Sequence, residues 1–278
     1  ISVFALLILM ILYLTLFESK RNTLIFMSRE SEQIHFYVNH EEIIMIERFE
    51  EIKSTLRLVP LFSDLNDKVL SHLAEVCQEK VYEKDQHILH QEQAGDNFFV
   101  IESGSVKVTR LAEDGREAVL AFLRDGDFFG ELAILDGETR SANIITLSEC
   151  KIQTINRREF LDLLEHHPSV ATALLMELAL RLRKTDMHLE YLTLSDAEGK
   201  IASILISLAE ENGTYKMGDV TLGDMPMQQD IANMAGTTRE TVSRMMKKLE
   251  EKNWLSRDGQ KVIIRKYSKF KEIYQLKF

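Results

Sequence analysis

The stretch that decides the fold spans residues 128–142 and reads FFGELAILDGETRSA. Glycines at positions 126, 130 and 137 interrupt an apolar run, so we expect the backbone to turn tightly on both sides of it. Residues 132–135 have the length of one short helical turn, whose free N–H groups can face an anion. The stretch therefore predicts a loop, a helical turn and a second loop that together cradle a charged ligand.

The polar side chains of this stretch suit a sugar phosphate. Arg140 offers a planar fork of donors, Ser141 offers a hydroxyl, and the small Ala142 lets its backbone amide approach closely. Glu131 lies nine residues before Arg140, and a buried carboxylate there can accept from a sugar hydroxyl while the guanidinium binds a phosphate. A plain surface salt bridge between Glu131 and Arg140 is the alternative, and the fifteen-residue string as a whole argues against it.

Gly-Glu-Leu-Ala at 130–133, followed by Arg-Ser-Ala at 140–142, resembles the phosphate-binding cassette of cyclic nucleotide-binding β-roll domains. The resemblance implies that Glu131 holds the ribose 2′-OH and that Arg140 and Ser141 hold the cyclic phosphate. It carries over four further cassette residues, namely Gly130, Leu132, Ala133 and Ala142. Cyclic GMP sites of the wider family often place Thr where this chain has Ser141, so we expect cyclic AMP rather than cyclic GMP as the ligand. No other cofactor is expected.

Composition limits the class of protein. The chain has 278 residues, enough for two modest domains, with 45% hydrophobic and 28% charged residues. Its two cysteines, Cys77 and Cys150, are far apart, so the sequence indicates no zinc site, no disulfide framework and no iron–sulfur sensor. We expect no metal and no catalytic residues, and we expect a reducing, cytoplasmic location.

Charge is distributed unevenly along the chain, whose net charge is −10. Residues 200–278 carry 14 Lys and Arg against 10 Asp and Glu, a net charge of +4, and the preceding part carries 20 against 34, a net charge of −14. A basic C-terminal part on an acidic body is typical of a chain that binds a polyanion at one end only.

The N-terminal residues 1–17 are almost wholly apolar and are followed by Lys20 and Arg21. One interpretation is a short membrane anchor that leaves the remainder cytoplasmic. The other is that residues 1–44 are translated upstream sequence, because Met45 precedes a family-like start and Glu41-Glu42 is compatible with a ribosome-binding purine run. A secretory signal is not indicated, since no basic segment precedes the run.

Residues 61–76 have helical spacing and predict one or two short helices at the start of the first domain. Short apolar runs separated by Gly and Asp turns follow, and they predict an antiparallel barrel or roll. The predicted strands are 81–82, 87–89, 98–101, 105–108, 118–123, 141–146 and 150–155. His87 and His90 are predicted to face opposite sides of their strand, which argues against a metal site.

A long helix is predicted over residues 169–194, after a short helix that ends at His167-Pro168. Its apolar positions step by four and three, as in a coiled-coil seam. The seam positions are Ala171, Leu175, Leu178, Leu182, Thr185, Leu189 and Leu192. In the cyclic AMP receptor protein family this helix forms the homodimer axis, which implies that Thr185 reaches the base. The resemblance places Asp186 where the family has a Ser that helps from the partner subunit, so this chain departs from the pattern there. A polar position in an ordinary intramolecular helix pair is the alternative for Thr185.

The C-terminal part predicts a winged helix-turn-helix. A break at residues 196–199 precedes a helix from Lys200, and residues 210–224 are predicted to hold short strands and turns. A helix over residues 228–235, a Gly236-Thr237 turn and a second helix over residues 238–253 follow, with Thr237 and Glu240 as a capping box. Residues 254–265 predict a β-hairpin wing.

The first turns of the second helix are predicted to enter the major groove of DNA. Arg239 and Arg244 can bind guanine edges, and Glu240 can accept from cytosine, although a capping role alone is the alternative for Glu240. Thr238, Thr241 and Ser243 can donate to phosphates, while Lys247, Lys248 and Lys252 add non-specific attraction. Residues 239–244 resemble the recognition-helix motif of the same family, which implies a TGTGA-like half-site in a palindrome.

These patterns together predict an α+β chain with an N-terminal β-roll of the jelly-roll kind, a long central dimerisation helix and a C-terminal winged helix-turn-helix. The predicted boundaries are an extension at 1–44, the nucleotide-binding roll at 45–167, the helix and hinge at 168–197, and the DNA-binding domain at 198–278. The predicted function is a bacterial, dimeric transcription regulator of double-stranded DNA, controlled by cyclic AMP and contacting RNA polymerase. The alternatives are a regulator of the same family that answers to another effector or none, and a membrane-tethered nucleotide-binding module. An enzyme is not expected.

Overall fold

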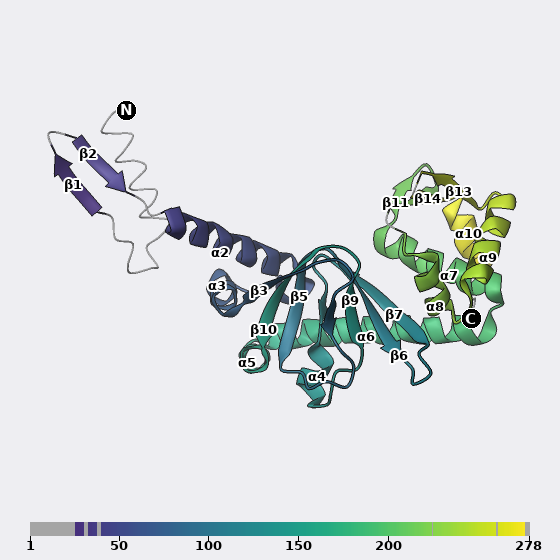
Figure 1. Ribbon diagram of the computed structural model, residues 1–278, viewed down its shortest axis with the longest axis horizontal. Coiled ribbons are helices and arrows are strands. Elements are labelled where there is room, and N and C mark those ends of the chain that lie inside the picture. The colour runs from purple at the N-terminus through teal and green to yellow at the C-terminus, as the bar shows by residue number, and fades with distance from the viewer. Residues whose placement is uncertain (1–25, 31–32, 38–39, 224, 260, 276–278) are drawn as a thin grey trace. The chain divides into compact units, whose positions relative to one another are not determined.

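The computed structural model describes residues 26–30, 33–37, 40–223, 225–259 and 261–275, and the chain divides into a unit that ends at Glu51 and a unit that begins at Ile52 (Figure 1). In the first unit, β1 (Phe26–Glu30) and β2 (Gln33–Tyr37) pair as an antiparallel hairpin. Helix α2 (His40–Leu58) runs across the boundary between the units. The apolar run at residues 1–17 lies outside the described residues. Among the described helices, none is long and apolar enough to cross a membrane.

The second unit begins with a roll of two antiparallel four-stranded sheets, as the spacing of the short apolar runs predicts. One sheet has the order β3-β10-β5-β8 and the other the order β4-β9-β6-β7. The strands are β3 (Gln78–Tyr82), β4 (His87–Leu89), β5 (Asn97–Ser103), β6 (Ser105–Leu111), β7 (Glu117–Arg124), β8 (Phe128–Phe129), β9 (Asn143–Thr146) and β10 (Cys150–Asn156). Strand β8 was not predicted, and it consists of the first two residues of the stretch that decides the fold.

Strand β5 fixes the position of this stretch because both of its faces are buried. On one face Phe98 stacks on Phe160, with ring centroids 4.1 Å apart. On the other face Phe99 stacks on Phe129 of β8 at 5.0 Å, between the two sheets. Aromatic pairs at these separations add to the stabilisation from burial, so β8 and the loop that follows it are held against β5.

Short helices precede and follow the strands of the roll, as predicted. They are the 3₁₀ helix η1 (Pro60–Phe62), α3 (Asp67–Val76) and α5 (Arg157–His166). Asn66 and Asn156 cap α3 and α5, each side chain accepting from the backbone N–H of the third residue on. The predicted long helix is α6 (Pro168–Leu194), and it begins with Pro168, whose fixed φ suits a first helical position.

The predicted break at 196–199 is wrong in extent. Helix α7 (Ala197–Asn212) already begins at Ala197, so that only Ser195 and Asp196 lie outside the helices. The Asp196 side chain accepts from the Gly199 backbone N–H at 2.8 Å and thereby starts the helix. The helix also extends three residues, 210–212, into the stretch that was predicted to hold short strands and turns.

The C-terminal domain is a winged helix-turn-helix, in agreement with the sequence (Figure 1). Helices α8 (Gln228–Ala235) and α9 (Arg239–Glu251) form the helix-turn-helix, and β13 (Leu255–Asp258) with β14 (Lys261–Ile264) forms the wing. Strands β11 (Thr214–Lys216) and β12 (Asp219–Leu222) complete a sheet of order β11-β12-β14-β13. Helix α10 (Tyr267–Tyr274) was not predicted, and its Phe270 is fully buried in the core of this domain.

Two local predictions are wrong for reasons that the backbone explains. The cap of α9 is Thr238 rather than Thr237, and its Oγ1 accepts from the Thr241 backbone N–H at 3.3 Å. The rings of His87 and His90 do not face opposite sides, because they stack with centroids 4.6 Å apart. Strand β4 ends before His90 and its register shifts within His87–Leu89, so the alternation of a regular strand does not hold there.

Candidate functional site

The predicted ligand cradle is a short helix between two glycines in the left-handed conformation. Helix α4 (Glu131–Asp136) follows Gly130, which has a φ of 83°, and precedes Gly137, which has a φ of 77°. Only glycine adopts these angles without strain, so the two residues let the chain turn sharply at both ends of α4. This geometry brings the start of α4 close to Arg140, whose guanidinium Nη1 donates to the Gly130 carbonyl oxygen at 2.8 Å.

Arg140 is buried at the bottom of the cradle, with only 5% of its surface exposed. Its Nη2 donates to the Asn97 carbonyl oxygen at 2.9 Å, whereas its Nε is buried and has no hydrogen-bond partner. A Cβ atom added at Gly95 would lie 2.2 Å from this Nε, so the absence of a side chain at Gly95 makes room for the guanidinium. A buried donor without an acceptor costs free energy, and an anion beside Arg140 would remove that cost.

Glu131, at the first position of α4, is buried to the same degree as Arg140. Its Oε1 accepts from Arg181 Nη1 at 3.2 Å, and Arg181 also donates to the Phe128 carbonyl oxygen at 2.9 Å. Burial raises the pKa of Glu131, while the charges of Arg181 and Arg140 act in the opposite direction.

Arg181 lies on α6, so the cradle is tied directly to the long helix. Its guanidinium carbon sits 4.4 Å from the centroid of the Phe128 ring, and its Nε donates to Glu177 at 3.1 Å. The sequence did not reveal this residue, because Arg181 lies 50 positions after Glu131 in the chain. Its one local signal is its position one helical turn before Thr185, which places the two residues on the same face of α6.

The structure places the other predicted cassette residues in two groups. Ala133 and Ala142 are buried, whereas Leu132 and Ser141 are exposed. On α6, Thr185 and Asp186 are both exposed, and the Thr185 hydroxyl donates to the Arg181 carbonyl oxygen at 2.9 Å. Within the described residues, no group of three or more His, Cys, Asp and Glu side chains is placed to hold a metal ion.

Helix α9 presents its predicted DNA-contacting side chains to the outside. Val242, Met246 and Leu249 face the domain core. The exposed residues on the opposite side are Thr238, Arg239, Glu240, Ser243 and Arg244. The Thr238 hydroxyl oxygen caps the helix by accepting from the Thr241 backbone N–H. Thr241 is partly buried, and its Oγ1 lies 3.5 Å from the Arg244 Nη2. Lys248 is directed elsewhere, because its Nζ lies 2.6 Å from Oε2 of Glu198, a buried residue of α7.

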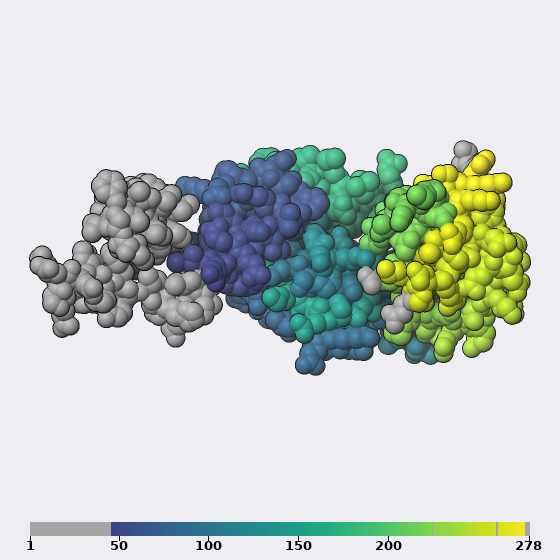
Figure 2. All heavy atoms as spheres, turned by 90° about the horizontal axis from the view of Figure 1, so that it is seen from above, coloured from purple at the N-terminus to yellow at the C-terminus, as the bar shows by residue number. Residues whose placement is uncertain are grey.

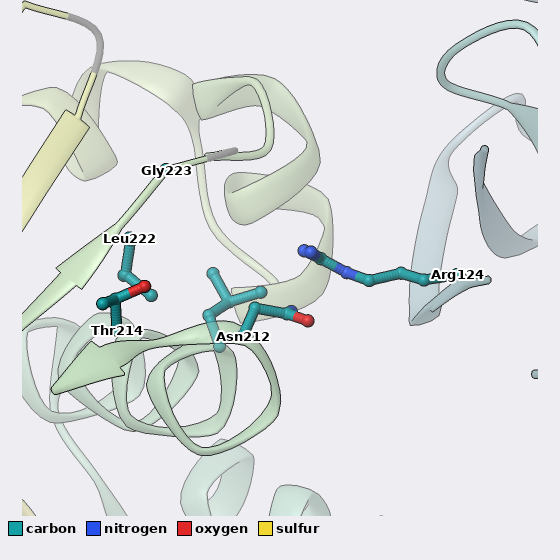
Figure 3. A pocket seen from close by; sticks show the side chains of 6 residues that line it. Arg124, Asn212, Thr214, Leu222 and Gly223 are labelled. Carbon is teal, nitrogen blue, oxygen red and sulfur yellow. The ribbon is translucent and has the colours of Figure 1, made fainter. Parts of the chain in front are cut away.

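The hairpin β6–β7 of the roll contacts α8 of the DNA-binding domain. Figure 2 shows teal atoms of the roll against green atoms of the C-terminal part of the chain. Lys107 Nζ lies 2.8 Å from Oδ1 of the buried Asp230 and 3.1 Å from Glu117 Oε2. Asn233 Nδ2 donates to the same Glu117 oxygen at 3.0 Å. A second contact region is a pocket of about 180 Å³, into which Arg124 extends toward Asn212 (Figure 3). None of the predicted site residues lines this pocket.

Comparisons with known proteins agree with both halves of this description. Residues 79–167 match the family model of the cyclic nucleotide-binding domain, and residues 199–273 match that of the Crp-like helix-turn-helix domain. The "cAMP-activated global transcriptional regulator CRP" of Pasteurella multocida is 32% identical over 204 residues, which cover 71% of this chain and 95% of that protein. The "CRP-like cAMP-activated global transcriptional regulator" of Mycobacterium tuberculosis is 29% identical over 204 residues, which cover 73% and 91%.

Solved structures agree in fold. FixK2 from Bradyrhizobium japonicum has a TM-score of 0.65 at 23% identity, and the match covers 73% of this chain and 100% of FixK2. A CooA mutant from Carboxydothermus hydrogenoformans has the same TM-score and identity, with 78% and 95% covered. The chain thus belongs to the CRP/FNR superfamily of bacterial transcription regulators, and it combines a cyclic nucleotide-binding domain with a DNA-binding helix-turn-helix domain.

Proposed function

We propose that this protein is a homodimeric transcription regulator whose binding to a TGTGA-like palindrome is controlled by cyclic AMP. The single observation that carries the nucleotide part is the presence of two buried charged side chains, Glu131 and Arg140, in one glycine-bounded cradle. Ligand control of DNA binding also needs a connection between the two functions, and the contact of Arg181 on α6 with Glu131 supports such a connection.

Cyclic AMP fits this cradle in two respects. Its phosphate would bind at Arg140, where the buried Nε lacks an acceptor. Its ribose hydroxyl would donate to Glu131, which is already held by Arg181. The relatives from Pasteurella multocida and Mycobacterium tuberculosis are both named as cAMP-activated, which supports the same ligand here. Ser141, Ala142, Thr185 and Asp186 complete the proposed contacts.

Homodimerisation is supported by the exposed leucines of α6. Leu175, Leu182 and Leu189 are 67%, 62% and 59% exposed, and they recur every seven residues along the predicted seam. A second copy of α6 would bury this stripe. We expect Leu182→Glu to convert the dimer to monomer in light scattering. Leu180→Glu is the matched control, because Leu180 is also exposed, at 54%, but lies off the seam. Equal effects of the two changes would contradict the proposed dimer axis.

DNA readout is proposed for the exposed side of α9. Arg239 and Arg244 would bind guanine edges, Glu240 would accept from cytosine, and Thr238, Thr241 and Ser243 would contact phosphates. With its Crp-like domain and two-fold symmetry, such a protein would bind a palindrome. We propose no enzymatic activity, since the relatives reported above are named as transcription regulators. Because these relatives are named as transcription regulators, RNA polymerase is also proposed as a partner. The proposed location is the cytoplasm.

The test is fluorescence-anisotropy binding of a TGTGA-N6-TCACA duplex to the full chain, with and without cyclic AMP, at one salt concentration. A scrambled duplex of equal length is the control. Strong enhancement by cyclic AMP on the palindrome alone would support the whole proposal. Tight binding regardless of nucleotide would keep the DNA part and assign the cradle to another effector or none. A failure to distinguish the two duplexes in either condition would refute the proposed target sequence.

A further inference from the structure

Glu198 occupies an unusual position in the DNA-binding domain. It lies in the first turn of α7, two residues after the non-helical Asp196, and its side chain is only 7% exposed. Its Oε2 accepts from Lys248 Nζ at 2.6 Å and its Oε1 from Lys252 Nζ at 2.5 Å. The Tyr274 hydroxyl of α10 donates to the same Oε1. One buried carboxylate thus connects three helices of the domain.

Both lysines come from the C-terminal end of the recognition helix. Lys248 is in the last turn of α9 and Lys252 is its C-cap, one turn later on the same face. A buried carboxylate is stable only when several donors surround it, so Glu198 and the two lysines hold one another in place. Thr238 fixes the opposite end of α9 through its capping hydrogen bond. The helix is therefore held at both ends, and Arg239 and Arg244, between these ends, are exposed.

The same contacts hold the ammonium groups of Lys248 and Lys252 at Glu198, where they are less available to DNA phosphates. Lys248 and Lys252 are 48% and 43% exposed, and both have their ammonium groups at Glu198. Lys247 is 77% exposed, and its Nζ is 4.0 Å from Glu251, an exposed neighbour on the same helix. Phosphate contacts supply most of the sequence-independent affinity for DNA. A lysine held by a buried carboxylate contributes less to that affinity than a free one.

We propose that Glu198 is a positioning residue that determines DNA specificity: it orients the recognition helix α9 and keeps Lys248 and Lys252 from DNA phosphates. This inference rests on the DNA-binding function proposed above and deepens it. By withholding two cations, Glu198 lowers non-specific affinity. By fixing the end of α9, it keeps Arg239 and Arg244 at a constant angle to the bases. Both effects increase the difference in affinity between the target sequence and other DNA.

The test is Glu198→Gln in the full chain, which removes the charge and keeps the size of the side chain. Kd is measured for the palindromic and scrambled duplexes over a series of salt concentrations. We expect the ratio of the two Kd values to fall about tenfold, as the loss of charge-assisted hydrogen bonds to α9 would produce. For the scrambled duplex, we expect log Kd to depend more steeply on log salt, by about 1–2 per subunit, because each freed lysine adds about 0.9.

Glu251→Gln is the matched control. It removes an equal charge from α9 itself, but Glu251 holds neither Lys248 nor Lys252. Equal results for the two variants, or a Glu198→Gln protein with unchanged ratio and slope, would overturn the inference. Tyr274→Phe removes one hydrogen bond to Glu198 without changing the charge, and it keeps the test decisive if Glu198→Gln does not fold. We expect a smaller fall in the ratio for Tyr274→Phe, and no fall would count against the inference.

The two proposals fail in distinguishable ways. If the parent protein does not prefer the palindrome, the proposed target sequence fails. The salt dependence on the scrambled duplex needs no target sequence and no nucleotide, so it still decides whether Glu198 withholds the two lysines. An unchanged slope in Glu198→Gln would then refute the inference by itself.

Discussion

The cradle and the recognition helix carry their charges in opposite ways. In the cradle, Glu131 and Arg140 are each 5% exposed and already contact other protein groups. On α9, Arg239 and Arg244 are exposed, and the opposite face of the helix packs in the core of the DNA-binding domain. A buried charge takes part in folding as well as in binding, whereas an exposed one takes part almost only in binding. Substitutions should therefore separate the two regions by their effects on stability.

The largest effect is expected for Arg140→Ala. Removing one partner of a buried, hydrogen-bonded charge costs about 2–5 kcal/mol, so cyclic AMP affinity should fall at least about 30-fold in calorimetric titrations. The melting temperature should fall as well, because the carbonyls of Gly130 and Asn97 lose their donor. Arg116→Ala, at a side chain that is 84% exposed, is the control and should change neither quantity. Unchanged affinity in Arg140→Ala would refute the proposed site.

Acid should distinguish the carboxylates of the two regions. Burial alone would raise the pKa of Glu198, but hydrogen bonds from Lys248, Lys252 and Tyr274 outweigh it and lower the pKa to about 2. Its stabilisation is therefore complete above pH 4.5 and is lost as the pH falls toward 2. The pKa of Glu131 is raised, so its contribution has the opposite sign: it is present below the ordinary pKa and lost as the pH rises through the raised one.

Glu198→Gln should accordingly lose stability at neutral pH and approach the parent protein in acid. The difference in unfolding free energy should reach at most about 3 kcal/mol above pH 4.5 and shrink toward pH 2, because one pKa unit corresponds to about 1.4 kcal/mol. Urea unfolding at several pH values measures it. A deficit that is the same at every pH would contradict the proposed charge of Glu198.

Gly95→Ala should reduce stability and cyclic AMP affinity as Arg140→Ala does, although it removes no charge. In Gly95→Ala the new Cβ would lie 2.2 Å from Arg140 Nε, so the guanidinium would have to shift. Overpacking of this kind costs about 1–3 kcal/mol of stability, and we expect weaker cyclic AMP binding with it. Gly223→Ala is the control, because a Cβ there meets nothing within 4 Å. Equal melting temperatures and affinities for both variants would show that Arg140 is not confined.

The smallest effect on stability is expected for Arg244→Ala. Its guanidinium is exposed, so the melting temperature should not change. Discrimination between the palindromic and scrambled duplexes should fall by about 1–3 kcal/mol, the range for a bidentate contact to guanine. Lys247→Ala should instead weaken binding to both duplexes alike and leave their ratio unchanged. If Arg244→Ala affected both duplexes equally, Arg244 would be a phosphate contact.

The sequence predicted those features that are encoded locally. The order of the elements, the β-roll and the winged helix-turn-helix follow from short runs, turn glycines and the family resemblance. The cradle could be predicted in detail because residues 128–142 are contiguous, and their glycines specify the backbone. The roles of individual residues in binding remain predictions that the experiments above test.

Features that depend on distant residues could not be predicted. Arg181 reaches Glu131 only because α6 packs along the roll, and Glu198 meets Lys248 only when α7 packs against α9. Local errors came from competing short-range signals. Both Thr237 and Thr238 are capping residues by type, and only the backbone shows which one begins the helix. The His87–His90 prediction failed because the strand is irregular and ends between them.

The burial of Arg140 also has a consequence for rates. Its Nε is fully buried and packs at Gly95, so this N–H can donate to a phosphate only after the guanidinium or the chain around it has shifted. We therefore expect nucleotide association in two phases: a fast encounter that depends on concentration, and a slower step whose rate saturates at high ligand concentration. Stopped-flow fluorescence would resolve them, and in Gly95→Ala, where the guanidinium is displaced beforehand, the balance between the phases should change.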